Sequence, residues 1–145
     1  DLSGVALPEE MKQAWVAGAQ ERLRAYAPRI RAVDAGQRIV EGVSLMDTPG
    51  HTPGHCSVVV ESGGASLVCT GDVVLHHVLG VERPEAGVVF DADAAVALRT
   101  RRRVLEMAAS EKRRLLMYHG AWPGLGRVRP KGGAFEWVFE PMQWA

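Results

Sequence analysis

A chain of 145 residues is long enough for one globular domain and can bury about 70% of the surface that its unfolded form would expose. Apolar residues make up 47% of the sequence and charged residues 23%, which is ordinary for a folded protein and argues against a disordered chain. The 17 Lys and Arg residues balance the 17 Asp and Glu residues, and no apolar run approaches the roughly 20 residues of a membrane helix, so we expect neither nucleic acid nor a membrane as a partner.

The first predicted helix begins near Pro8-Glu9-Glu10, because proline and acidic residues are common in the first turn of a helix. Apolar residues then recur at helical spacing until Pro28 interrupts: Met11, Trp15, Ala19, Leu23 and Tyr26. The pattern predicts a helix with one buried face. Core packing is the favoured interpretation of Trp15 and Tyr26.

Two short strands are predicted over residues 38–40 and 43–46, and they lead into Thr48-Pro49-Gly50-His51-Thr52-Pro53-Gly54-His55. The two Pro-Gly steps bend this loop sharply, so its two imidazoles can point at a common centre. A single loop histidine is more often a capping or surface residue than a metal ligand. A metal site is therefore predicted only if other ligands lie nearby.

A hairpin follows the loop, with strands over residues 56–61 and 66–70 and a glycine-rich turn between them. If the turn is centred on Gly63 and Gly64, Glu61 faces Ser66 and Asp72 falls opposite His55. Paired strands lie about 5 Å apart, so Asp72 and a loop histidine can reach one ion.

The only cysteines are Cys56 and Cys69, which lie on neighbouring strands of this hairpin but out of register, since Val58 faces Cys69. Two reduced, buried thiols are the favoured interpretation, and a disulfide or a metal role is the alternative. The compartment stays open, with the cytoplasm favoured.

After Asp72 an apolar run contains the pair His76-His77, and a helix is predicted over residues 93–110. Asp91 and Asp93 lie at the N-terminus of this helix, where acids complement the helix dipole and cap free amide groups. Four arginines crowd its middle and predict a solvated or salt-bridged face: Arg99, Arg101, Arg102 and Arg103.

A short apolar run over residues 114–120 predicts a buried strand with His119 at its exit. His51, Asp72 and His119 would then all lie at strand ends. A last hairpin turns at residues 130–133, and period-two alternation puts three aromatic residues on one strand face: Phe135, Trp137 and Phe139. They pack in the core or cover a part of the fold that lies outside this chain.

These motifs resemble the metallo-β-lactamase superfamily over nearly the whole chain. In that family a ligand His follows Thr-Pro-Gly, a bridging Asp closes the next hairpin in a Gly-Asp pair, and a last His ends a later strand. The resemblance makes His51, Asp72 and His119 the metal ligands, with Asp72 also the catalytic residue. Phe90-Asp91-Ala92-Asp93 and the segment from His119 to Val128 are similar to the branch of methyl parathion hydrolase and the acyl-homoserine lactone lactonases.

The same resemblance implies roles for further residues. His55 is expected to be a structural residue behind the ligands, since the family uses the first histidine of the loop. His76 and Trp122 are weaker candidates for the substrate pocket. In this branch the first helix lies near the mouth of the active site, so Trp15 and Tyr26 could wall the pocket instead of packing in the core.

One family motif, His-x-His-x-Asp-His, occurs nowhere in the sequence. In the family it lies upstream of the first helix of this chain. We therefore expect residues 1–145 to be a single, partial α+β domain, the C-terminal half of an αββα sandwich. Such a half would leave an apolar sheet face uncovered, so we expect it to pack with the N-terminal half or to form a homo-oligomer.

The implied activity is hydrolysis of an ester, lactone or phosphotriester through a metal-bound hydroxide, with a divalent metal, zinc favoured, that is dinuclear in the complete protein. We expect the complete protein to be an enzyme and the isolated chain to be inactive. The alternative is a non-catalytic module or a complementing half that packs with another chain and binds metal weakly or not at all.

Overall fold

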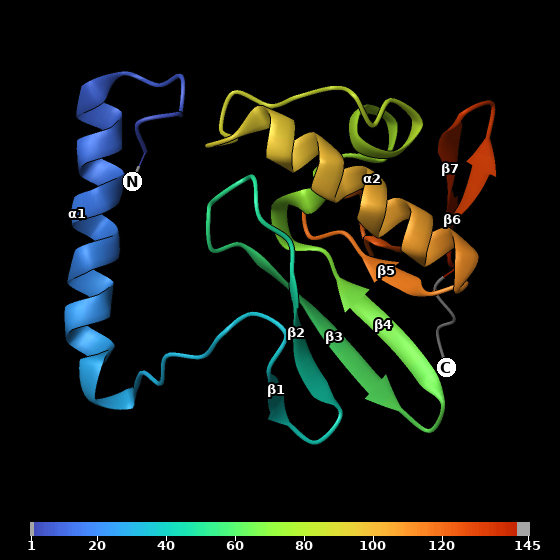
Figure 1. The fold of residues 1–145 in the computed structure, drawn as a ribbon, viewed down its shortest axis with the longest axis horizontal. Helices are drawn as coiled ribbons and strands as arrows, with labels where there is room; N and C mark the ends of the chain where they lie inside the picture. Colours follow the sequence, from blue (N-terminus) through green and yellow to red (C-terminus); the bar gives the residue numbers. More distant parts are fainter. Residues whose placement is uncertain (1, 142–145) are drawn as a thin grey trace.

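The structure is a computed structural model, and it describes residues 2–141. Seven strands form one sheet whose spatial order follows the sequence (Figure 1). The strands are β1 (Arg38–Val40), β2 (Val43–Asp47), β3 (Cys56–Ser62), β4 (Ala65–Cys69), β5 (Arg114–Leu116), β6 (Leu125–Lys131) and β7 (Ala134–Phe139). The predicted mixture of helix and sheet is confirmed.

Two α-helices accompany the sheet, α1 (Glu9–Tyr26) and α2 (Ala94–Ser110). Helix α2 connects β4 to β5, the one parallel pair of the sheet, since a parallel connection needs a long crossover. Shorter helical segments are η1 (Ala27–Arg29), η2 (Gly71–Val73) and η3 (His77–Glu82). No helix of the described residues is both long enough and apolar enough to cross a membrane.

The β3–β4 hairpin has the predicted register, in which Glu61 pairs with Ser66 and Val58 with Cys69. Gly63 and Gly64 have φ values of 54° and 79°, the left-handed conformation that a tight two-residue hairpin turn requires. Cys56 lies opposite Asp47 on β2, and both thiols are unpaired and half-buried. The register therefore keeps the two cysteines apart.

One face of the sheet packs against α2 and forms the core. Val104, Leu105 and Ala108 of the helix are at most 1% exposed. They cluster with Val68, Leu115, Phe135 and Trp137 of the strands. Of the three aromatic residues on the β7 face, Phe135 and Trp137 are buried in the core, whereas Phe139 is 47% exposed.

The opposite face of the sheet, which we call the open face, is also apolar. Side chains alternate along each strand, so the neighbours of buried Val59, Val68 and Leu115 point the other way. The register brings these neighbours side by side, and all are half-buried: Val43, Leu45, Val58, Val60, Leu67 and Leu116. An apolar layer of this kind is suited to pack against a second sheet.

Helix α1 stands beside the sheet instead of covering it (Figure 1). Its predicted span is correct, but the prediction of a buried face is wrong for the described residues, since none of its residues is buried. Trp15, Leu23 and Tyr26 are 47%, 58% and 56% exposed. The apolar residues of α1 do recur at helical spacing, but the sheet does not cover the face that they form.

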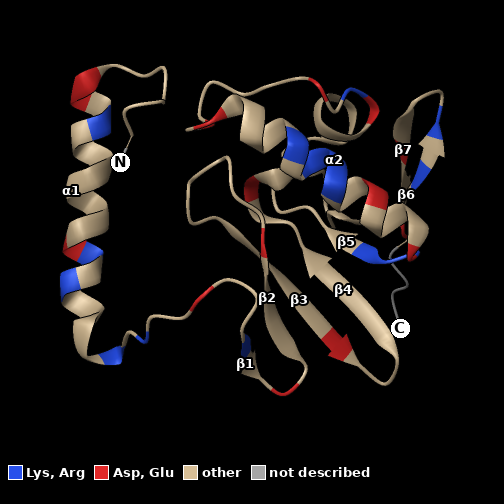
Figure 2. Cartoon of the chain, in the orientation of Figure 1, with Lys and Arg blue, Asp and Glu red and all other residues tan. Residues whose placement is uncertain are grey.

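Arginines crowd the middle of α2 (blue in Figure 2), and they differ in exposure. Arg99 and Arg103 are exposed, as predicted for a solvated face. Arg101 is only 2% exposed, and its side chain points under the helix. A buried guanidinium needs partners for its N–H groups, and Arg101 finds them in the carbonyls of Val73, Pro84 and Ala86.

Candidate metal centre

The loop that carries His51 is held against the start of α2. Gly50 has a φ of 132°, and a Cβ there would lie 2.3 Å from the Cα of Ala97. The backbone N–H of Asp93 donates to Gly50 O at 3.0 Å, and that of Ala92 donates to His51 O at 3.1 Å. Only glycine permits this approach, so it places His51 beside the helix terminus.

Asp72 lies in η2, directly after β4, and its carboxylate faces two histidines. His51 Nε2 is 3.5 Å from Asp72 Oδ2, and His119 Nε2 is 3.1 Å from Asp72 Oδ1. Asp72 Oδ1 is buried and has no hydrogen-bond partner within the described residues. The three predicted ligands are thus brought together, from three segments that are far apart in the sequence.

These distances suit side chains that share metal ions. Two ligand atoms at about 2.0–2.1 Å from one tetrahedral zinc ion lie about 3.3 Å apart, close to the 3.1 and 3.5 Å measured here. No group of three or more His, Cys, Asp or Glu residues within residues 2–141 converges on a single metal position. Asp72 turns one carboxylate oxygen toward each histidine, so the two imidazoles face different oxygens.

A buried carboxylate lies behind His51. Asp91 Oδ1 is 3.1 Å from His51 Nδ1, and the Asp91 side chain is only 1% exposed. Asp91 accepts any proton that Nδ1 carries, and Nε2 of the same ring is turned toward Asp72. In the sequence Asp91 is only a helix-terminal acid, and nothing signals its contact with a histidine 40 residues away. The cap itself is Asp93, which accepts from the N–H of Val96 at 2.9 Å.

His55 has a different environment from His51. Its Nε2 accepts from the backbone N–H of Asp72 at 3.0 Å, and its Nδ1 lies 3.0 Å from Thr48 O. Both ring nitrogens are therefore occupied by the protein. Burial lowers the pKa of His55, which favours the neutral ring that these two contacts need. His55 holds the turn that carries Asp72.

The three facing side chains lie in a pocket of about 710 Å³ with mostly apolar walls. Its other lining residues are Leu2, Val5, Trp15, Thr52, Leu75, Phe90 and Tyr118. The rings of Trp15 and Phe90 are 6.0 Å apart, so α1 contributes one wall. Of its two aromatic candidates, Trp15 lines the pocket and Tyr26 does not.

Two weaker candidates lie outside the lining of this pocket. His76 Nδ1 accepts from the N–H groups of Val78 and Leu79 and so caps η3. Trp122 is 82% exposed. A role for either residue with substrate stays a prediction.

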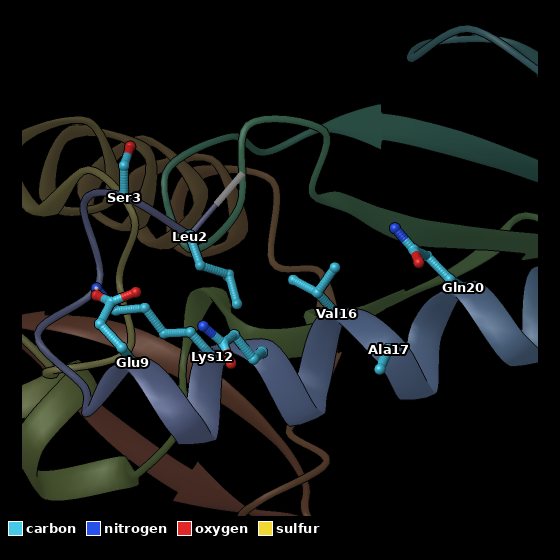
Figure 3. A pocket seen from close by; sticks show the side chains of 8 residues that line it. Leu2, Ser3, Glu9, Lys12, Val16, Ala17 and Gln20 are labelled. Carbon is cyan, nitrogen blue, oxygen red and sulfur yellow. Dashed lines mark hydrogen bonds and ion pairs between the residues drawn. The ribbon is translucent and has the colours of Figure 1, made fainter.

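A second hollow, of about 610 Å³, lies along α1 (Figure 3). It contains an ion pair between Lys12 and Glu9 at 2.9 Å, and Leu2 also lines the first pocket. Its lining has no histidine or cysteine. The three facing side chains His51, Asp72 and His119 line only the first of these two pockets.

Comparison with known proteins gives three kinds of match. Residues 4–119 match the family model described as the metallo-beta-lactamase superfamily. An N-acyl homoserine lactonase from a Bacillus species is 33% identical over 84 residues, which are 57% of this chain and 32% of that protein. The lactonase from Bacillus cereus is 31% identical over 83 residues, with the same coverage.

Two solved structures resemble nearly the whole chain. AidC, a dizinc quorum-quenching lactonase in complex with its product, superposes with a TM-score of 0.89 at 28% identity, over 98% of this chain and 49% of that one. The hydrolase AbOPH of the beta lactamase superfamily superposes with a TM-score of 0.80 at 28% identity, over 96% and 49%. The chain spans about a third of the length of the curated relatives and about half of these structures.

Proposed function

Because the chain belongs to the metallo-β-lactamase superfamily, as its motifs and its lactonase-like relatives both indicate, we propose that it forms part of a metal-dependent hydrolase. One observation carries the proposal. The carboxylate of Asp72 turns one oxygen toward His51 and the other toward His119, in the wall of an apolar pocket. A bridging carboxylate between two imidazoles is an arrangement that divalent metals favour.

The residues fit a metal because one buried oxygen of Asp72 has no hydrogen-bond donor and both facing imidazoles present Nε2. His51, Asp72 and His119 would hold the ions, with zinc favoured. The metal would supply a Lewis acid that activates water and offsets the negative charge developing on the substrate oxygen. Asp91 would keep His51 in place through its contact with Nδ1, and His55 would keep the Asp72 turn in place because its Nε2 accepts from the backbone N–H of Asp72.

For the substrate we favour a lactone, and an ester or a phosphotriester is the next choice. The support is the pocket, whose apolar walls of Trp15, Phe90 and Leu75 lie beside the polar cluster. Such walls bind an apolar group and keep water from it, while the cluster faces the bond to be broken. The similarity of the chain to proteins described as lactonases supports the same choice.

We also propose that the site is completed by ligands from a second polypeptide segment. The three side chains offer two imidazole nitrogens and two carboxylate oxygens, whereas two zinc ions would usually take four donors each. The open face of the sheet would pack against that segment, as the second layer of a sandwich or as another copy of the chain. A non-catalytic half that binds metal weakly rests on the same geometry, and the experiment below distinguishes the two.

The test is metal content by elemental analysis, after equilibration with zinc, of the protein and of its H51A, D72A and H76A variants. We expect zinc to be lost in the first two variants and kept in H76A, because His76 caps η3 instead of facing the pocket. Equal zinc in all four proteins would contradict the assignment of the ligands. Zinc binding without hydrolysis of lactones, aryl esters or phosphotriesters in the complete protein would support the non-catalytic half.

A further inference from the structure

Arg101 is a buried side chain to which sequence analysis assigned no role beyond a solvated or salt-bridged face. It is 2% exposed and lies under α2. Its Nε donates to Val73 O at 2.8 Å, and its Nη1 donates to Pro84 O at 3.0 Å and Ala86 O at 2.7 Å. Three of its five N–H groups thus bind backbone carbonyls.

The remaining nitrogen of Arg101 faces the candidate site. Nη2 lies 3.7 Å from Asp91 Oδ2, and the other oxygen of Asp91 is in contact with His51 Nδ1. Val73, which Arg101 also binds, directly follows Asp72. The Arg101 guanidinium therefore binds the backbone next to Asp72 and also lies near the Asp91 carboxylate that contacts His51.

The contacts of Arg101 join two separate segments of the backbone. Burial of a guanidinium is costly, and burial lowers the pKa of Arg101 while the charge of Asp91 raises it. An apolar side chain of similar length could fill the same space at a lower cost in desolvation. An apolar side chain could not hydrogen-bond to the backbone of both η2 and residues 84–91, so it could not fix the spacing between these two segments.

We propose that Arg101 is a positioning residue that holds Asp91 and the Asp72 turn in register, so that Nε2 of His51 stays turned toward the Asp72 carboxylate. The purpose of this positioning rests on the proposed function, whereas the contacts themselves do not. His51 is the readout, because Asp91 contacts Nδ1 of its ring. Arg101 acts on His51 through Asp91 and on Asp72 through the Val73 carbonyl.

The experiment is nitrogen-15 NMR of uniformly labelled, chelator-treated protein, in which the ring nitrogens of His51 and His55 and the backbone amide of Asp72 are followed together. In D91L we expect the ring signals of His51 to shift while those of His55 stay unchanged, because Asp91 contacts Nδ1 of His51. In R101Q the His51 ring signals should shift in the same direction. The amide signal of Asp72 should shift as well, because Arg101 donates to the carbonyl of the next residue.

Two further variants keep the test decisive. R99Q removes an exposed arginine two residues away on the same helix and should leave both histidine signals unchanged. R101K keeps the charge with a single ammonium, so its His51 signals should lie between those of wild type and R101Q, which matters if R101Q fails to fold by circular dichroism. Folded R101Q or R101K with His51 and Asp72 signals identical to wild type would overturn the proposal.

A zinc titration of the same samples separates this inference from the proposed function. Loss of an outer partner of a metal-bound histidine typically weakens metal binding about 10–100-fold, and we expect that loss in D91L and R101Q but not in R99Q. If wild type binds no zinc but the NMR pattern holds, the proposed function fails and the positioning role stands. If wild type binds zinc and R101Q binds it equally well with unchanged NMR signals, the positioning role fails alone.

Discussion

The G50A substitution tests how the metal loop is placed against α2. A Cβ at residue 50 would lie 2.3 Å from both the Cα and the backbone N of Ala97, and a helix backbone cannot move aside as a flexible side chain can. The φ of 132° adds strain for any residue with a Cβ. Strained backbone costs about 1–3 kcal/mol and overpacking about 1–3 kcal/mol, so we expect a loss of about 2–6 kcal/mol.

The matched control is G54A, in the second Pro-Gly step of the same loop. A Cβ there meets no atom within 4 Å, and Gly54 is not among the glycines with a positive φ. We expect G54A to change the free energy of unfolding by less than about 1 kcal/mol, because alanine restricts the unfolded chain slightly. Urea unfolding of the three proteins measures both values. A G50A protein as stable as G54A would refute the close contact between the loop and α2.

Three further predictions concern His55, the open face and the pocket wall. Burial lowers the pKa of His55 in the folded protein. The stability that its neutral ring contributes is therefore complete above the unfolded pKa of about 6.5, and it is lost as the pH falls through the lower folded pKa. H55Q should therefore flatten the fall in unfolding free energy between about pH 7.5 and 5, and an equally steep fall would contradict a buried neutral His55. On the open face, V60K should reduce self-association and the binding of a hydrophobic dye, with little loss of stability. On the covered face, V59K should lower the free energy of unfolding by about 3 kcal/mol or more, because Val59 is only 7% exposed. At the pocket, W15A should raise KM about 10-fold for lactones with long apolar chains, and W122A should not, because of these two residues only Trp15 lines the pocket. A W15A protein with the KM of the wild type would contradict a contact between Trp15 and the substrate.

Local sequence determined much of the fold. The β3–β4 hairpin, the start of α1 near Pro8 and the end of α2 at Ser110 follow from turn glycines, an N-terminal proline and apolar spacing, which act between residues that are close in the chain. The motifs around His51, Asp72 and His119 determined the family, since each consists of a few adjacent residues whose types carry the chemistry.

Only the tertiary structure decided which residues stand behind those motifs. Asp91 had the sequence context of a helix-terminal acid and Arg101 that of a solvated or salt-bridged arginine, yet both are buried, and together they reach His51 and the backbone beside Asp72. The apolar spacing of α1 predicted a buried face, but burial depends on where neighbouring layers lie, and α1 stands beside the sheet. Spacing along a chain reports which side chains share a face, whereas the partner of that face is determined by elements far away in the sequence.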